Sequence, residues 1–401
     1  MFTRNLFAAA VLLLTAVPGA HPAAAAEIAL EVSAGDSDRI ETPVCAEIDL
    51  PDVPPAEAVV QVKGPDGTVP GQLVAAADKK KAALWWPLSL KKGRKAAYTA
   101  TITQGKPAGK GFAFQDTPGD HLDLLFEGRR VTRFLYAFGY DRDRKKRFPT
   151  AKPFTHVFDA AGAGIITSPG GQPYPHHRGI FIGWSGTAAG GKRYDFWGMG
   201  STWQRVGKFT ARQAGPVLGR MAAAVLWEAE MDKPVLMEDR TITVYRRGKP
   251  ELLLELVSTL RTPGPDVALD GDPEHAGCQF RAHPDVGKNQ GQTRYLLPAG
   301  MKEGRRGTLD MPWACMSFQL GGSRFHVAQL NHPGNPKGTV YSANRRYGRF
   351  GAFPKAAVKA DEPLTLRYRF FVRQSEQPLT AEEIDRLGAD FTKPPQVTVK
   401  P

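Results

Sequence analysis

Residues 174–184, YPHHRGIFIGW, place two histidines and an arginine directly before an apolar run. The prolines on either side of the tyrosine favour an extended chain and exclude a helix. Adjacent side chains of an extended segment point to opposite faces, so only one of His176 and His177 can face a given cleft. Arg178 would share the face of His176. A histidine and an arginine on one face can move a proton and hold an anionic oxygen, so we expect this stretch at the lip of a cleft.

Four later stretches also concentrate polar side chains that strands do not need: RYDFW, EHAGCQFR, NHPGN and NRRYGR. In the first, Asp195 stands among aromatic residues, which predicts a desolvated carboxyl group with a raised pKa and an acid or base role. Arg178 and Arg281 would stabilise negative charge that develops on an oxygen. The candidate catalytic residues are His176, His177, Arg178, Asp195 and Arg281, and the candidate substrate-binding residues are Trp197, His275, Gln279, His332, Asn335, Arg346 and Tyr347.

These residues also have structural interpretations. A histidine at the end of a strand can simply bond a buried carbonyl group. The tryptophans at 184, 197, 203 and 313 could present flat faces to sugar rings, but most of them are expected in the core of a β-sandwich.

The histidines show no metal-binding spacing, since neither His-x-x-x-His nor His-Glu-x-x-His occurs. Sheet proteins can assemble metal sites from distant strands, so we predict no cofactor and leave a divalent metal open. The three cysteines, Cys45, Cys278 and Cys315, allow at most one intramolecular disulfide. Buried unpaired thiols are the simpler expectation.

The composition favours a turn-rich protein with a sizeable core. Hydrophobic residues make up 42% of the chain, and 42 glycines and 33 prolines favour many turns and few long helices. The formal net charge is +13, but the basic residues are scattered and lack interleaved aromatic residues. We therefore predict a solvated basic surface and no nucleic-acid partner.

The first 26 residues have the three parts of a secretory signal: a positive start at Arg4, an apolar stretch of 11 residues at 7–17, and a cleavage site near Ala26. No later segment has 18 consecutive apolar residues, so we expect no membrane span. The prediction is a periplasmic or secreted protein with a small-molecule or oligosaccharide ligand.

The remaining chain predicts an all-β architecture. Residues 27–103 resemble a small immunoglobulin-like β domain, 104–120 a linker, and 121–378 a large antiparallel β-sandwich. Residues 364–372, LTLRYRFFV, alternate with period two, as in a half-buried strand. Residues 379–401 form a C-terminal helix and tail, with a capping box between Thr380 and Glu383. A β-propeller is the alternative, although no blade period is evident.

The order HHRGIFIGW, YDFWG, EHAGCQFRA and NHPGNPKGTVYSANRRYGRF resembles the PmoA family, an exported bacterial family of unknown function. The resemblance covers residues 120–375. Many members carry another histidine where this chain has Tyr174 and Pro175. The matching positions are His176, His177, Arg178, Asp195, Phe196, Trp197, His332, Pro333, Asn335, Arg346, Tyr347 and Gly348.

The resemblance implies a large β-sandwich that is similar, at the level of fold, to sandwiches of the galactose-mutarotase type. The family name is that of a membrane-spanning methane monooxygenase subunit, which this chain does not resemble. The favoured function is an exported carbohydrate-active protein that acts on a sugar by His/Asp acid–base chemistry, whether hydrolase, lyase or epimerase. One alternative is a non-catalytic carbohydrate or envelope-polymer binder, and a second is a copper-dependent oxygenase.

Overall fold

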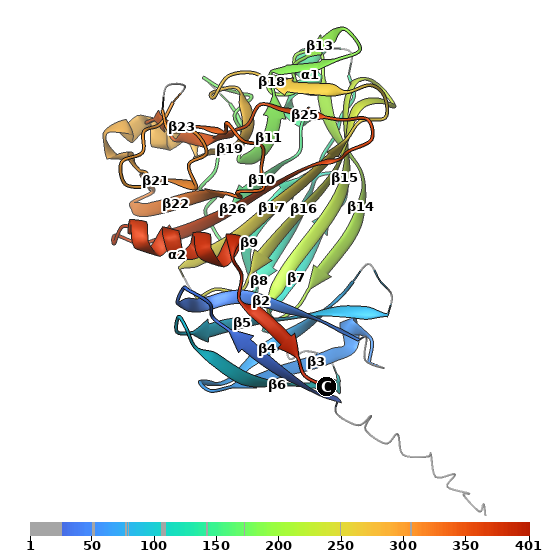
Figure 1. Cartoon of the computed structure of the whole chain (residues 1–401). Coiled ribbons are helices and arrows are strands. Elements are labelled where there is room, and N and C mark those ends of the chain that lie inside the picture. The colour runs from blue at the N-terminus through green and yellow to red at the C-terminus, as the bar shows by residue number, and fades with distance from the viewer. Residues whose placement is uncertain are drawn as a thin grey trace, which may run out of the picture.

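The structure is a computed structural model, which describes residues 26–49, 53–76, 78, 80–105, 110–141, 143–171, 173–248, 250–304 and 307–401. The predicted signal peptide lies outside these residues except for Ala26. The all-β prediction is confirmed, because the described chain forms antiparallel sheets with few helices (Figure 1). Among the described residues no helix is long and apolar enough to cross a membrane.

The N-terminal domain is a seven-stranded sheet in the order β2-β5-β4-β3-β6-β1-β27. Its apolar face encloses a separate hydrophobic cluster that includes Leu84 and Trp86. The C-terminal tail contributes a strand to this sheet, since Leu30 pairs with Val399. The strands are β1 (Ala26–Ser33), β2 (Arg39–Asp49), β3 (Ala58–Gly64), β4 (Gly67–Ala75), β5 (Lys81–Leu90), β6 (Lys95–Gln104) and β27 (Gln396–Val399).

The large domain is a sandwich of two eight-stranded sheets. The first sheet has the order β23-β24-β19-β11-β10-β9-β8-β7. Its strands are β7 (Phe112–Thr117), β8 (His121–Phe126), β9 (Arg129–Leu135), β10 (Phe154–Val157), β11 (Ile180–Trp184), β19 (Ala276–Arg281), β23 (Val340–Arg345) and β24 (Arg349–Phe353). The predicted linker 104–120 therefore differs in part, because its residues Phe112–Thr117 pair with β8 inside this sheet.

The second sheet has the order β14-β15-β16-β17-β26-β22-β21-β20. Its strands are β14 (Trp203–Ala214), β15 (Leu218–Glu230), β16 (Lys233–Tyr245), β17 (Glu251–Arg261), β20 (Arg294–Leu296), β21 (Trp313–Leu320), β22 (Ser323–Asn331) and β26 (Leu364–Gln374). A smaller four-stranded sheet at one end comprises β12 (Gly186–Ala189), β13 (Lys192–Tyr194), β18 (Val267–Asp270) and β25 (Ala356–Val358).

The main hydrophobic core lies between the two large sheets. Alternate residues of β11 and β19, such as Ile182 and Phe280, meet Tyr368 and Phe370 of β26 there. The predicted strand at 364–372 is confirmed, but Phe371 on its other face is also buried. That face is covered by a helix, so the strand is buried on both sides.

The covering helix is α2 (Ala381–Thr392), which lies across the outer face of the second sheet (Figure 1). Both bonds of the predicted capping box between Thr380 and Glu383 are present. The other short helical segments are α1 (Arg144–Arg147), η1 (Pro55–Glu57), η2 (Phe148–Thr150) and η3 (Pro284–Gln292). All three cysteines are free thiols, with the one at 45 exposed and the other two buried.

Candidate functional site

The outer face of the first sheet carries the candidate site. Because β11 and β19 place their alternate apolar residues in the core, Phe181, Gln279 and Arg281 point outward. The neighbouring strand β24 adds Arg349 to the same face, directly opposite Arg281 in the antiparallel register. Loops from other parts of the chain cover this face and bury it.

The segment before β11 is a turn and not the extended stretch that its prolines predict. The amide of His177 donates a hydrogen bond to the carbonyl oxygen of Tyr174, 3.0 Å away. The rings of His176 and His177 therefore lie side by side, with their centroids 4.3 Å apart. The prediction that the two histidines face opposite sides was wrong, because the prolines fix their own φ angles but leave the following residues free to turn.

Six aromatic rings meet above the sheet, and we call them the histidine cluster: Tyr174, His176, His177, Trp197, His275 and Tyr347. Tyr174 stacks on His177 at 5.1 Å between ring centroids and contacts Tyr347 at 4.9 Å. His176 lies 6.2 Å from His275, and Trp197 lies 6.3 Å from His275. Five of these six residues are sequence candidates that the structure brings together, and Tyr174 completes the set.

His177 is 2% exposed, and both of its ring nitrogens lack a hydrogen-bond partner among the described residues. The indole nitrogen of Trp197, whose ring is 6.0 Å from that of His177, is buried and unpartnered in the same way. Burial lowers the pKa of His177, and it lowers the pKa of His176 to about 4. Both imidazoles are therefore weak bases that stay uncharged at neutral pH, and each ring offers one donor and one acceptor of hydrogen bonds.

His275 is held differently from the other two histidines. Its side chain is about half exposed, and its Nδ1 lies 3.0 Å from both carboxylate oxygens of Asp272. A carboxylate at Nδ1 favours the tautomer in which Nε2 of the neutral ring is a proton acceptor. Asp272 was missed in the sequence, where DPEH matches no established catalytic motif.

Lys152 is a second residue that sequence reasoning missed. It is 2% exposed, its Nζ donates to the carbonyl oxygen of Trp197 at 2.7 Å, and the same atom lies 4.0 Å from the centroid of the Phe181 ring. Burial, and to a lesser extent the charge of Arg178, hold the pKa of Lys152 well below its ordinary value. No local pattern in the surrounding PTAKPF marks this lysine, because only the fold places it beside the cluster.

Arg178 anchors a neighbouring segment. It does not share the face of His176, although the sequence predicted that it would. Its guanidinium donates to the carbonyl oxygens of Pro149 at 2.8 Å and Phe148 at 2.7 Å, and to Pro175 at 3.3 Å. Burial lowers its pKa to about 10. These bonds give Arg178 a positioning role, since they tie η2 to the turn that carries the histidines.

Asp195 positions Trp197. Its Oδ1 accepts hydrogen bonds from the amides of Trp197 at 2.9 Å and Gly198 at 2.7 Å, which closes a tight turn. That turn lies directly on β11 at Gly183, where a Cβ atom would come within 2.1 Å of the carbonyl oxygen of Phe196. The acid–base role expected for Asp195 stays a prediction.

Two buried arginines lie beside the cluster. Arg281 stacks over the ring of Tyr347 at 4.9 Å and donates to the backbone of the same residue, and burial lowers its pKa to about 10. Arg349, which is 0% exposed and was missed in the sequence, donates to the hydroxyl of Tyr347 at 3.3 Å. Gln279 accepts from Arg349 at 3.0 Å and donates to a backbone carbonyl, so it orients that arginine.

Three sequence candidates lie outside the cluster. His332 packs its ring against Phe391 of α2, at 5.0 Å, in a groove between the two domains. Asn335 bonds the side chain of Asn331 at 2.7 Å and the backbone of Arg367. Arg346 is exposed on the hairpin between β23 and β24. The NHPGN stretch therefore shapes a turn on the second sheet and does not join the histidines.

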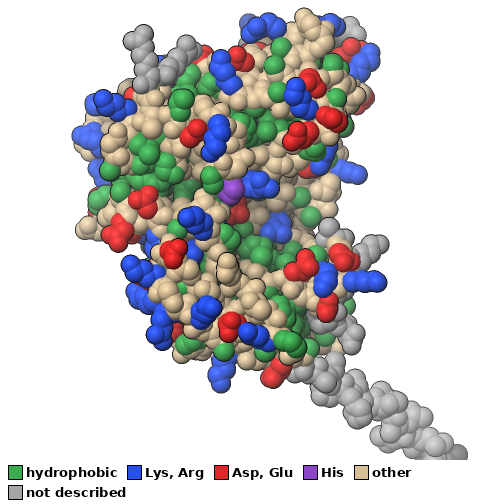
Figure 2. All heavy atoms as spheres, in the orientation of Figure 1, with side chains coloured by type: hydrophobic (Ala, Val, Ile, Leu, Met, Phe, Trp, Pro, Cys, Tyr) green, Lys and Arg blue, Asp and Glu red, His purple; other side chains and the backbone are tan. Residues whose placement is uncertain are grey.

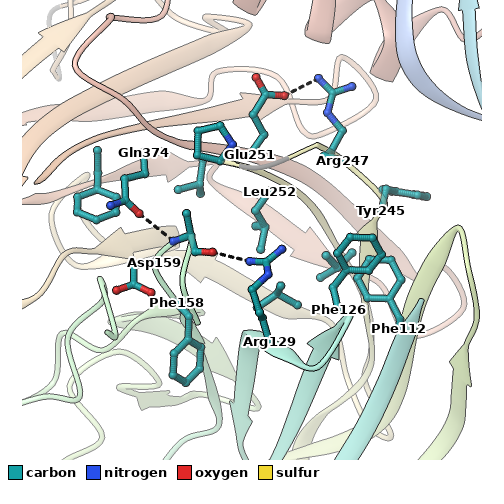
Figure 3. A pocket seen from close by; sticks show the side chains of 16 residues that line it. Phe112, Phe126, Arg129, Phe158, Asp159, Tyr245, Arg247, Glu251, Leu252 and Gln374 are labelled. Carbon is teal, nitrogen blue, oxygen red and sulfur yellow. Dashed lines mark hydrogen bonds and ion pairs between the residues drawn. The ribbon is translucent and has the colours of Figure 1, made fainter. Parts of the chain in front are cut away.

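A different, small hollow lies between the two sheets, with a cavity volume of about 30 Å³ (Figure 3). Its walls are mainly apolar, with Phe112, Phe126 and Leu252 among them. The polar groups in Figure 3 are already bonded, as Arg129 and Gln374 both hold the backbone of residue 160. None of the candidate site residues lines this hollow, so the hollow has few groups that could take part in catalysis.

Within the described ranges, no group of three or more His, Cys, Asp or Glu side chains is placed to hold a metal ion. The copper-dependent alternative therefore stays a prediction without support from the ligands seen here. On the face drawn in Figure 2, basic side chains are scattered among acidic ones, in keeping with the solvated basic surface expected from the sequence.

Three comparisons place the chain among known proteins. A family model described as "Family of unknown function (DUF6807)" matches residues 121–389. A solved structure of a GalM/aldose epimerase homologue from C. elegans covers 66% of this chain and 98% of its own, at 10% identity and a TM-score of 0.27. A match with that TM-score supports no conclusion about this chain, and the fold is assigned from the sheets described above. A search of curated proteins found no match. None of these comparisons mentions the PmoA family, so that resemblance stays a prediction.

Proposed function

The chain belongs to DUF6807, a family of unknown function, and we propose that it is an exported carbohydrate-active protein whose histidine cluster binds a sugar or sugar derivative and transfers a proton from it. The observation that carries this proposal is His177, a buried imidazole with two unpartnered nitrogens inside a cage of aromatic rings. The cage provides both an apolar face and unused polar atoms.

An unsatisfied buried polar group costs about 1–3 kcal/mol, so a protein that keeps one commonly uses it. A neutral imidazole needs one donor and one acceptor, and a sugar hydroxyl supplies both. The indole N–H of Trp197 can only donate, so it requires an oxygen acceptor from the ligand. These are the hydrogen-bonding properties of a polyhydroxylated ring.

The aromatic rings of the cluster suit the apolar faces of a sugar. Tyr174 is 38% exposed, and His275 is about half exposed, so a ligand can reach the cluster from solvent. Flat rings contact sugar CH groups while the polar atoms at their edges bond hydroxyls. Such mixed lining is typical of small-molecule sites.

The arrangement also supports acid–base chemistry. His275, oriented by Asp272, has the geometry of a general base that a carboxylate positions. Lys152 and Arg281 are the cations that would stabilise negative charge on a substrate oxygen. Epimerisation, elimination and hydrolysis of sugars all require proton transfer to or from a carbon or oxygen atom, and we propose a reaction of this class.

Binding is tested by thermal shift on the protein that begins at Glu27, with mono- and oligosaccharides and sugar acids as ligands. A sugar that binds the native state raises its melting temperature by mass action. We expect that shift to disappear in His177→Phe, which fills the cage without nitrogens. The matched control is His332→Phe, on the other sheet, which should retain the shift. A full shift in His177→Phe would refute the site.

The second candidate function is a non-catalytic carbohydrate binder. It is favoured by the finding that Arg178 and Asp195 are committed to backbone bonds, which leaves fewer groups for chemistry. His275→Gln separates the two functions once a ligand is known. An enzyme would lose kcat by about a hundredfold or more while it still binds the ligand. A binder shows no turnover in the wild type.

A further inference from the structure

The histidine cluster is bordered by buried positive charges that form no ion pair with a carboxylate among the described residues. We propose that the sugar bound there is acidic, such as a uronate, and that its carboxylate is held by Lys152 together with Arg281 and Arg349. This inference rests on the proposed function, because it names the class of sugar that the same site takes.

The three cations are almost entirely buried, with exposed fractions of 2% for Lys152, 4% for Arg281 and 0% for Arg349. None of them forms an ion pair with a carboxylate in the part of the chain that the structure describes. Their acceptors are all neutral: a backbone carbonyl for the lysine, backbone carbonyls for Arg281, and hydroxyl, amide and carbonyl oxygens for Arg349. A buried charge without a counter-charge is costly.

The two arginines add to this cost because they are cross-strand neighbours. Arg281 of β19 and Arg349 of β24 are directly opposite in the register, and like charges in that position destabilise a sheet. The charge of Arg349 also contributes to the lowered pKa of Arg281, after burial itself. An anionic ligand would offset the repulsion between these two arginines.

Each cation touches an aromatic residue of the cluster. Lys152 donates to the backbone of Trp197, and both arginines contact Tyr347, one over its ring and one at its hydroxyl. These three buried positive charges therefore border the histidine cluster.

The acidic residues near the cluster already have other roles. Asp195 closes the turn of Trp197, Asp272 orients His275, and Glu274 pairs with Arg345. With both His176 and His177 neutral, the balance of formal charge around the cage is positive. The unpartnered indole N–H of Trp197 also calls for an acceptor, and a carboxylate offers about four acceptor sites.

The experiment compares matched acidic and neutral sugars by titration calorimetry at constant ionic strength: galacturonate with galactose, and glucuronate with glucose. We expect the acid of one pair to bind with a Kd at least about tenfold lower than its neutral partner, since hydrogen bonds to charged groups are the stronger ones. Lys152→Met should bring the two Kd values to within about twofold. Lys208→Met, an exposed lysine on β14, is the control and should keep the preference.

The outcomes separate this inference from the proposed function. Equal binding of acidic and neutral sugars, lost in His177→Phe, would overturn the acidic ligand and leave the sugar site standing. Sugar binding that survives His177→Phe would overturn the site itself. Inorganic phosphate that produces the full effect of a uronate would also overturn the acidic-sugar assignment. If Lys152→Met does not fold, Arg281→Gln tests the same preference.

Discussion

Cross-strand arginines on the outer faces of the two large sheets have different partners. On the second sheet Arg369 lies opposite Glu255 and Arg373 lies opposite Glu251, so each cross-strand pair joins unlike charges. On the first sheet Arg133 pairs with Asp123 in the same way, but Arg281 lies opposite another arginine. Both faces are covered, the second by α2 and the first by loops, so burial alone does not explain the difference.

The difference indicates which of these pairs serve packing and which serve binding. A buried ion pair is satisfied within the protein, and the arginine at 373 even adds a bond to Glu383 of α2. Buried cations without partners lower the stability of the empty protein. Chains retain such costs mainly at functional sites, where a ligand supplies the missing charge.

The largest effect is expected on the paired face. Arg369→Met removes the arginine that pairs with Glu255 and leaves a partly buried carboxylate whose remaining bond among the described residues is to the hydroxyl of Tyr245. We expect a loss of about 3 kcal/mol in the free energy of unfolding, measured by urea denaturation. Arg367→Met, at an exposed position on the same face of β26, should change it by less than about 0.5 kcal/mol. Equal losses in the two variants would break the comparison.

The first face is also predicted to be the more acid-sensitive one, although burial lowers the pKa of His326 and His332 on the second sheet as well. His156 of β10 is buried, and burial together with the charge of Arg133 lowers its pKa to about 4. The unfolded chain, with an ordinary histidine pKa near 6.5, then binds more protons than the folded one. Stability is therefore complete above about pH 6.5 and is lost as pH falls towards 4, with a slope of up to about 1.4 kcal/mol per pH unit from this group.

The measurement is urea denaturation between pH 7 and pH 4 on the wild type and His156→Gln. The variant loses the hydrogen bond of Nδ1 to Thr167 but cannot titrate, so its stability should fall less steeply in that window. A parallel pH dependence in the two proteins would show that this histidine titrates normally in the folded state.

Two buried histidines give a closer comparison. His326 of β22 bonds Ser317 at 2.7 Å and the carbonyl oxygen of Ser375 at 2.9 Å, whereas both nitrogens of His177 are unpartnered. His326→Phe should lose about 1–3 kcal/mol in thermal or urea denaturation, because two bonded groups are left unsatisfied. His177→Phe should lose little or become more stable. A loss as large as that of His326→Phe would mean that His177 has a structural partner.

Sequence patterns predicted what depends on local periodicity. The alternation in 364–372 and the spacing of Thr380 and Glu383 each specify an element within a few residues, and both are confirmed. The histidines also signalled a cluster, because adjacent polar groups before an apolar run are unusual. Lys152 and Arg349 were missed because their burial beside the rings depends on the pairing of distant strands, which no single segment encodes.

The wrong or incomplete expectations share a cause. Residue type suggested that His332 and Asn335 join the site, yet the chain direction after β22 places them on the second sheet. Likewise, the sequence could not show that Oδ1 of Asp195 accepts hydrogen bonds from two backbone amides, because these bonds depend on the conformation of the turn. Residue types therefore indicate which chemistry is possible, but the topology of the strands decides which residues come together.

The smallest change in stability, and the sharpest test of the comparison, is expected at Lys152. Its ammonium makes one hydrogen bond, to the carbonyl oxygen of Trp197, and its pKa is lowered because it is buried. Lys152→Met removes that bond but also removes the cost of a desolvated amine, so the two effects nearly cancel. We expect the free energy of unfolding of the ligand-free protein to change by less than about 1 kcal/mol, while the preference for an acidic sugar is lost. A loss as large as that of Arg369→Met would mean that the lysine stabilises the fold as a paired arginine does, and the contrast between the two faces would then fail.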